Sequence, residues 1–219
     1  MKIILCFSTI FLLSSQAVFA QDQSVKQLQA DANKTISKDA ADTIPKVWKT
    51  GGLFNLNINQ GALKDWAAGG DRSSLSIASL LDLHAYYRKG KNQWDNTLQM
   101  AYGFVNTTSL GSRKSDDRFD LLSKYGYEFR KQWYLSALFN LRTQFSKGYS
   151  YTDNNSKVLM SDFFAPAYIL LSPGITYQPC NNFSLFVSPV TARWVIVKND
   201  SLSAAGAYGV DPGKKAKVE

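Results

Sequence analysis

Residues 93–105 read QWDNTLQMAYGFV, and in this stretch apolar and polar side chains alternate. Even-numbered positions are mostly apolar, as at Leu98 and Met100, whereas Asp95 and Gln99 occupy odd-numbered positions. Successive side chains of a β-strand point to opposite faces of the sheet. The stretch therefore predicts a strand with one apolar face and one polar face.

Six further segments have the same texture, and each predicts a strand. The seven predicted strands cover about 51–60, 73–88, 93–105, 117–130, 132–145, 163–178 and 183–198. The last two are more apolar, and Pro173 and Pro189 interrupt them. Because proline has no N–H to donate to a sheet ladder, we expect bulges or edge positions there.

The lengths of the strands and of their connections indicate a membrane barrel. Several predicted strands reach the roughly 9–11 residues that cross a bilayer, against roughly 5–6 in soluble sheets. Short connections at 89–92, 131 and 179–182 alternate with long ones at 61–72, 106–116 and 146–162. Short periplasmic turns and long outer loops are typical of bacterial outer-membrane barrels. Aromatic residues beside the short turns predict an interfacial girdle; they are Tyr86, Tyr87, Trp94, Phe129, Trp133 and Phe183.

The N-terminus predicts export. Residues 1–20 combine Lys2, a short apolar run and a small-residue ending at Ala20, which is typical of a cleaved signal peptide. Residues 21–46 are polar and predict a flexible periplasmic leader, so that the barrel domain spans 47–219. Cleavage would leave Cys180 as the single cysteine, which excludes an internal disulfide in the mature chain.

The polar faces of the strands gather the ionisable side chains, and we expect this row to face the barrel lumen. Its members are Asp82, His84, Arg88, Asp95, Asp120, Lys124, Glu128 and Arg142. Such a row could line a pore for small polar or charged solutes. Alternatively, opposite charges on neighbouring strands pair and fill the interior, which is the favoured interpretation for a small barrel.

Other function classes find little support in the sequence. The net charge of +8 is scattered among acidic residues and forms no basic stripe for nucleic acid. One histidine and one mature cysteine cannot build the usual zinc sites, and we expect no metal or other cofactor. A serine–histidine hydrolase around His84, with Asp82 as orienting acid, lacks a recognisable nucleophile motif. We therefore expect no enzymatic activity.

Several motifs together resemble a known family. They are WKTGG at 48–52, LKDWAAGG at 63–70, GKNQWDN at 90–96, RKSDDR at 113–118, FFAPAY at 163–168 and FSLFVSP at 183–189. In this combination the chain, over about 47–212, resembles the Bacteroidetes family catalogued as domain of unknown function 3078. The resemblance implies an outer-membrane barrel. Members of that family usually continue for several more strands, so a C-terminally truncated chain is expected.

The predicted fold is all-β, an antiparallel up-and-down transmembrane β-barrel that is incomplete, with about seven strands present. The predicted role is structural or small-solute passage in the outer membrane. Outer-membrane lipid and, during biogenesis, the barrel-assembly machinery are the expected partners. Two alternatives remain open at this point. One is a surface binding or adhesion protein that uses the long loops, and the other is a soluble periplasmic β protein.

Overall fold

A computed structural model describes residues 47–62, 73–151, 156–180 and 183–219. The predicted signal peptide at 1–20, the leader at 21–46 and most of the first long loop lie outside the described residues. The order of elements is β1 (Trp48–Ala62), β2 (Ser73–Lys89), β3 (Asn92–Thr107), β4 (Gly111–Arg130), β5 (Trp133–Thr143), β6 (Gly148–Tyr151), β7 (Lys157–Ser161), β8 (Ala167–Cys180), β9 (Phe183–Val187), β10 (Ala192–Ile196), α2 (Asp200–Ala204), η1 (Ala207–Gly209) and β11 (Ala216–Val218).

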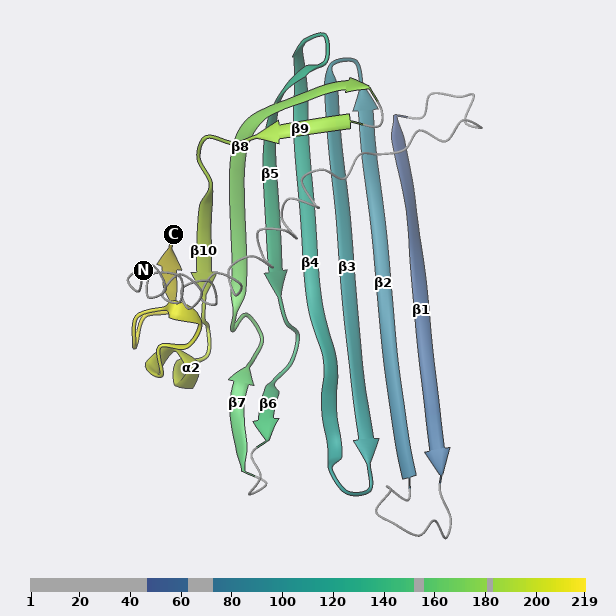
Figure 1. The fold of residues 1–219 in the computed structure, drawn as a ribbon, viewed down its shortest axis with the longest axis vertical. Helices are drawn as coiled ribbons and strands as arrows, with labels where there is room; N and C mark the ends of the chain where they lie inside the picture. The colour runs from purple at the N-terminus through teal and green to yellow at the C-terminus, as the bar shows by residue number, and fades with distance from the viewer. Residues whose placement is uncertain (1–46, 63–72, 152–155, 181–182) are drawn as a thin grey trace, which may run out of the picture.

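Nine strands form one antiparallel sheet, which confirms the all-β fold class. The order across the sheet is β1-β2-β3-β4-β5-β8-β10-β11, and β9 pairs with β8 alone. Strands β1 to β5 run up and down as neighbours, as Figure 1 shows. In the described part of the chain, β1 and β11 are the two edges, and the sheet is open. Among the described residues, no helix is long and apolar enough to cross a membrane.

The register of the central strands follows the period-two pattern of the sequence. Leu83 lies opposite Leu98, and Leu98 lies opposite Leu121 on the next strand. One residue away, Asp82 lies opposite Gln99, and Gln99 opposite Asp120. Residues that lie directly across neighbouring strands share a face. The sheet therefore has one apolar and one polar face through β1 to β5 and into β8.

The two-residue turns β2–β3 and β4–β5 lie at one end of the sheet, which we call the turn end, and the opposite end is called the loop end (Figure 1). Gly90 and Gln132 adopt positive φ angles of 57° and 71° in the two-residue turns that join β2 to β3 and β4 to β5. Both turns match predicted short connections.

The prediction of a long loop at 106–116 is wrong. β3 continues to Thr107 and β4 begins at Gly111, so that only residues 108–110 form the turn. Gly111 has a φ of 66°, a conformation that glycine adopts at little steric cost. The ladder continues through polar residues here, with Phe104 opposite Lys114 beyond a register shift. The end of β3 and the start of β4 were predicted as a loop because their residues are polar.

The predicted loop at 146–162 also contains secondary structure. β6 and β7 pair antiparallel as a separate two-stranded sheet, here called the β6–β7 hairpin. The seventh predicted strand, 183–198, is in fact two strands, β9 and β10. Pro189 lies in the break between them, and this position was one of the expected interruptions.

At the turn end, β8 bends and carries β9 over the polar face of the sheet. Figure 1 shows the upper part of β8 and β9 crossing in front of β5 and β4. Phe186 of β9 packs against a buried cluster of Leu122, Leu138 and Leu170, which come from three strands of that face. A second buried cluster joins Val195 and Val197 to Leu202 of α2 and Val210.

Candidate functional site

The register places all eight residues of the predicted polar row on one face of the sheet. Three of them lie in line across the strands, joined by Gln99: Asp82 and Asp120 flank Gln99, and Arg142 lies opposite Asp120. Gln99 Nε2 donates to Asp82 Oδ2 at 2.8 Å. Arg142 Nε donates to Asp120 Oδ2 at 2.8 Å, and Asn140 Nδ2 donates to the other oxygen of Asp120 at 2.7 Å. These contacts form a cross-strand polar ladder in the middle of the sheet.

The other row residues lie nearer the turn end. Arg88 Nη1 and Asp95 Oδ1 form an ion pair at 2.5 Å. The Nζ of Lys124 lies 5.1 Å from the ring centre of Phe186, so β9 covers this lysine with an aromatic face. Glu128 accepts a hydrogen bond from the N–H of Gln132 in the turn. The row therefore contains two ion pairs, Arg88–Asp95 and Arg142–Asp120, whose charges cancel.

His84 lies in an aromatic and crowded setting. Its ring stacks on that of Tyr86 with centroids 4.9 Å apart. On the neighbouring strand, a Cβ at Gly51 would lie 2.5 Å from His84 Nε2. Gly51 thus leaves room for the imidazole, which accounts for glycine in an otherwise regular strand. Tyr86 was predicted to belong to the interfacial girdle, but the register places it on the polar face opposite Asp95, so this assignment is wrong.

Aromatic side chains gather on the apolar face at the turn end. The Trp48 ring centre lies 5.0 Å from that of Tyr87 and 6.0 Å from that of Trp94. Farther across the sheet on the same face, the ring centres of Trp133 on β5 and Tyr177 on β8 are 4.6 Å apart. This set, which we call the aromatic row, includes rings whose polar atoms are satisfied. Trp94 Nε1, for example, donates to Ser123 Oγ at 2.8 Å.

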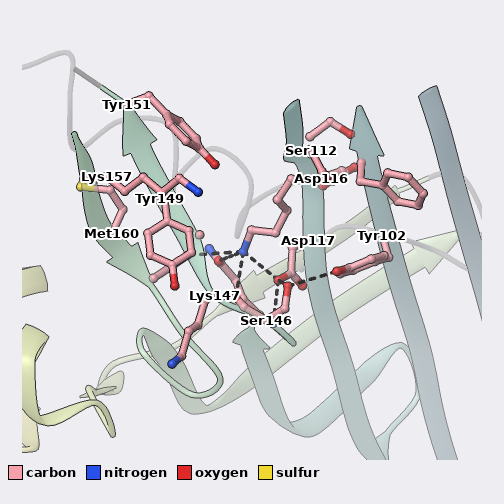
Figure 2. A pocket seen from close by; sticks show the side chains of 16 residues that line it. Tyr102, Ser112, Asp116, Asp117, Ser146, Lys147, Tyr149, Tyr151, Lys157 and Met160 are labelled. Carbon is pink, nitrogen blue, oxygen red and sulfur yellow. Dashed lines mark hydrogen bonds and ion pairs between the residues drawn. The ribbon is translucent and has the colours of Figure 1, made fainter. Parts of the chain in front are cut away.

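A cavity of about 830 Å³ opens at the loop end, between β4 and the β6–β7 hairpin. Figure 2 shows Tyr149, Tyr151 and Lys157 on its hairpin side and Tyr102 and Asp116 on its sheet side. The remaining polar lining includes Ser112, Ser115, Gln144 and Lys147. We call this space the loop-end cavity. The sequence alone did not reveal this cavity, because most of its lining lies in segments that were predicted as loops.

The floor of the loop-end cavity is a hydrogen-bonded ion pair. Lys114 Nζ donates to Asp117 Oδ2 at 2.8 Å, to Gln144 Oε1 at 3.0 Å and to the carbonyl of Ser146 at 2.9 Å. Asp117 also accepts the N–H groups of Phe145 and Ser146 at 2.7 and 2.9 Å. The Asp117 side chain is 1% exposed and that of Lys114 is 17% exposed. The pair therefore fixes the segment after β5 onto β4.

A β-bulge places this pair on the apolar side of the sheet. The register shifts between Gly103 and Phe104, so that Phe104 faces Lys114 while Tyr102 faces Asp117. Both Tyr102 and Phe104 belong to the apolar face. The motif at 113–118 contains the pair, but only the bulge brings its two charges to one side. The motif was therefore visible in the sequence, and its geometry was not.

Beyond the floor, cation–π contacts join the hairpin to β4. The Arg113 guanidinium lies 3.8 Å from the ring centre of Tyr151, and Lys157 Nζ lies 5.9 Å from the same ring. Within the described part of the chain, no group of three or more histidine, cysteine and acidic residues could hold a metal ion. The chemistry that this cavity offers is therefore hydrogen bonding, aromatic contact and positive charge.

Comparison with known proteins locates one family. Residues 58–149 match the model of a family described as a protein of unknown function, DUF3078. No curated protein and no solved structure matches the chain. The matched segment begins in β1 and ends in β6, so it contains the polar ladder and the Lys114–Asp117 pair. The match confirms the predicted resemblance to this family over residues 58–149, which is part of the expected range 47–212.

Proposed function

We propose that this chain is an outer-membrane β-barrel protein whose interior is filled by paired polar side chains and whose role is primarily structural. The observation that carries the proposal is the separation of the two sheet faces. On the apolar face, large side chains point away from the sheet, and no described residue packs over them to bury them. Phe54 is 64% exposed, Ile58 60% and Leu135 59%. Contiguous apolar surface of this kind is rare on soluble monomers and is typical of a lipid contact.

The height of the apolar band supports the same proposal. The band is limited at the turn end by the aromatic row, and at the loop end by the Lys114–Asp117 pair. Along β3, this interval runs from Trp94 to Tyr102, which is about nine residues. A tilted strand of roughly this length crosses the apolar core of a bilayer. Aromatic rings at the band's edge are where interfacial girdles lie.

The contacts of the polar face favour a structural role over small-solute passage. The charges cancel within each of two ion pairs, Arg88–Asp95 and Arg142–Asp120. Phe186 of β9 lies against Lys124. An interior filled in this way leaves little space for an aqueous pore. In the membrane the proposal also requires a pairing partner for β1, because lipid cannot satisfy an open sheet edge. Assembly of such a barrel would involve the barrel-assembly machinery.

Surface binding is the second candidate, and the loop-end cavity favours it. The cavity lies at the end of the sheet opposite the two-residue turns β2–β3 and β4–β5. In an outer-membrane barrel that end faces the outside of the cell. A filled barrel that carries a surface site would satisfy both proposals.

Two measurements test these proposals. In cell fractionation, we expect the full-length protein in the outer-membrane fraction, released only by detergent. Recovery in the detergent-free periplasmic fraction would contradict the membrane proposal.

In planar bilayers, we expect no ion currents from the purified protein. Regular single-channel currents would instead support solute passage over a structural role.

A further inference from the structure

We propose that the loop-end cavity binds a saccharide that carries an anionic group. The inference rests on the cavity's lining and its floor, and it does not depend on insertion of the sheet into a membrane. No part of the polar ladder takes part in it. The ligand is defined by its chemistry: a sugar ring with a carboxylate or phosphate attached.

The walls of the cavity supply aromatic rings from two independent elements. Tyr102 comes from β3, and Tyr149 and Tyr151 come from β6. Tyr102 and Tyr149 are each 42% exposed, although large aromatic side chains are usually buried more fully. A tyrosine offers an apolar ring and a polar hydroxyl together. A sugar ring has the complementary character, because its C–H groups form an apolar face and its hydroxyls form a polar rim.

Polar groups near the rings match that rim. Ser112, Ser115 and Asp116 line the sheet side, and Gln144 lines the base of the cavity. Ligand sites commonly combine aromatic walls with a few placed hydrogen-bonding groups. Ser112 and Asp116 are exposed, and Figure 2 shows both on the wall that faces the hairpin. This mixture favours a polyhydroxylated ligand over an apolar one.

The charge of the lining favours an acidic ligand. Lys114, Lys147 and Lys157 line the cavity together with Asp116 and Asp117. Lys114 and Asp117 form the buried floor and cancel each other. The exposed charges are then two lysines against one aspartate. A carboxylate or phosphate that reaches the amine of Lys157 or that of Lys147 would gain a charge-assisted hydrogen bond.

The floor holds the two walls in place before any ligand arrives. Asp117 accepts hydrogen bonds from Lys114 and from the backbone of Phe145 and Ser146, so it joins β4 to the chain that leads into β6. A preformed site pays less ordering entropy on binding. The cavity is thus a site built by the fold and not a gap between two loose segments.

Isothermal titration calorimetry on the full-length protein in detergent tests the proposal. The probes are trigalacturonate as the acidic saccharide, maltotriose as the neutral saccharide of the same length, and mixed detergent micelles that contain a phosphorylated glycolipid. We expect binding of trigalacturonate, of the glycolipid micelles, or of both, and at least tenfold weaker binding of maltotriose. Trigalacturonate and the glycolipid micelles distinguish a free acidic glycan from a lipid headgroup as the source of the ligand.

Matched variants locate the binding site. Tyr149→Ala should weaken binding about tenfold through loss of one ring contact. Tyr127→Ala is the control, because Tyr127 is 41% exposed but lies at the turn end, and it should leave binding unchanged. The double variant K147Q/K157Q should abolish the preference for the acidic probe.

Three results would overturn the proposal. They are absence of binding for both acidic probes, equal affinity for maltotriose and trigalacturonate, and an affinity that Tyr149→Ala leaves unchanged while the circular dichroism spectrum shows an intact fold.

Discussion

At the scale of single residues, the carboxylate of Asp117 joins β4 to the segment that follows β5. Its carboxylate accepts hydrogen bonds from Lys114, from two backbone N–H groups and from the hydroxyl of Ser146 at 3.0 Å. A buried charge is tolerated only when it is paired and hydrogen-bonded. All of these donors lose their anionic acceptor if the charge is removed.

We therefore expect Asp117→Asn to lower the free energy of unfolding by about 3 kcal/mol, because Lys114 would keep its charge in a buried position without a counter-ion. Urea unfolding followed by tryptophan fluorescence measures this change. Asp211→Asn is the control, since the Asp211–Lys214 pair is 68–69% exposed and should contribute less than about 1 kcal/mol. Equal effects of both variants would contradict the assigned role of Asp117.

Asp162 links the end of β7 to the start of α2. Its Oδ1 accepts the N–H of Phe163 and its Oδ2 accepts Asn199 Nδ2, both at 2.8 Å. Asn199 in turn caps α2 through its side-chain oxygen. Burial raises the pKa of Asp162, but the hydrogen bonds from Phe163 and Asn199 and the charges of Lys147 and Lys114 outweigh it. The net pKa lies below the ordinary value of 3.8.

This direction sets the expected pH dependence. A carboxyl whose pKa is lower in the folded state stabilises the fold above its ordinary pKa, and it loses that contribution as the pH falls through the folded value. Relative to their intrinsic exchange rates, the amides of Ser201 and Leu202, which the Asn199 cap protects, should exchange faster as the pH falls below the ordinary pKa of 3.8. Hydrogen exchange read by mass spectrometry measures this. In Asp162→Asn the acceleration should disappear; if it persists, another group is responsible.

At the scale of elements, the crossing of β9 over the sheet depends on a glycine. A Cβ at Gly174 of β8 would lie 2.3 Å from the carbonyl oxygen of Val187 and 2.9 Å from the Phe186 ring. These contacts are shorter than any side chain tolerates, so the two strands can approach only with glycine at this position. The bend in β8 then brings Phe186 onto the leucine cluster of the polar face.

Gly174→Ala should consequently displace β9 and cost about 1–3 kcal/mol in the free energy of unfolding. Amide exchange should rise in β9 before the central strands are affected. Gly61→Ala serves as the comparison, because a Cβ there meets nothing within 4 Å. If β9 keeps its protection in Gly174→Ala, the crossing does not depend on this contact.

The strands were predictable from the sequence to the extent that their pattern has period two. The faces of β2, β3 and β5 follow directly from it, as Leu83 and Leu98 on one side and Asp82 and Gln99 on the other illustrate. The extensions beyond the apolar band could not be predicted in this way. Lys114 and Asp116 look like loop residues by polarity, yet they remain paired with β3.

The loop-end cavity could not be predicted from the sequence for a further reason. Its floor depends on a bulge that brings Lys114 and Asp117 to the same side, and period-two counting cannot detect one extra residue among polar neighbours. Its hairpin wall depends on the pairing of β6 with β7 inside a segment of loop-like composition. The charged ladder, in contrast, required only a correct count of alternate positions.

At the scale of the whole molecule, the sheet presents one face of exposed apolar side chains and one face whose polar side chains contact one another. Leu83 lies on the first face, 41% exposed, opposite Leu98 at the middle of the apolar band. A substitution at Leu83 separates the membrane proposal from the soluble alternative. The Leu83 side chain is exposed to the medium around the protein, which is lipid in the first case and water in the second.

Leu83→Arg should cost about 2–4 kcal/mol if this face meets the middle of a bilayer. In water the same change at an exposed position should stay within about 0.5 kcal/mol. Unfolding from lipid vesicles in urea measures the difference. Leu110→Arg, in the β3–β4 turn beyond the band and 53% exposed, should be tolerated in either setting. A tolerated Leu83→Arg in vesicles would contradict lipid contact.

The cross-strand ladder of Asp82, Gln99, Asp120 and Arg142 also favours the native strand register during assembly. These four side chains meet only in one alignment of β2 to β5. A slip of one strand by a single residue would turn its entire set of side chains to the other face. The slipped strand would then carry its charges to the apolar face and separate them from their partners. In the proposed membrane setting this face meets lipid, so a misaligned intermediate would be less stable than the native alignment.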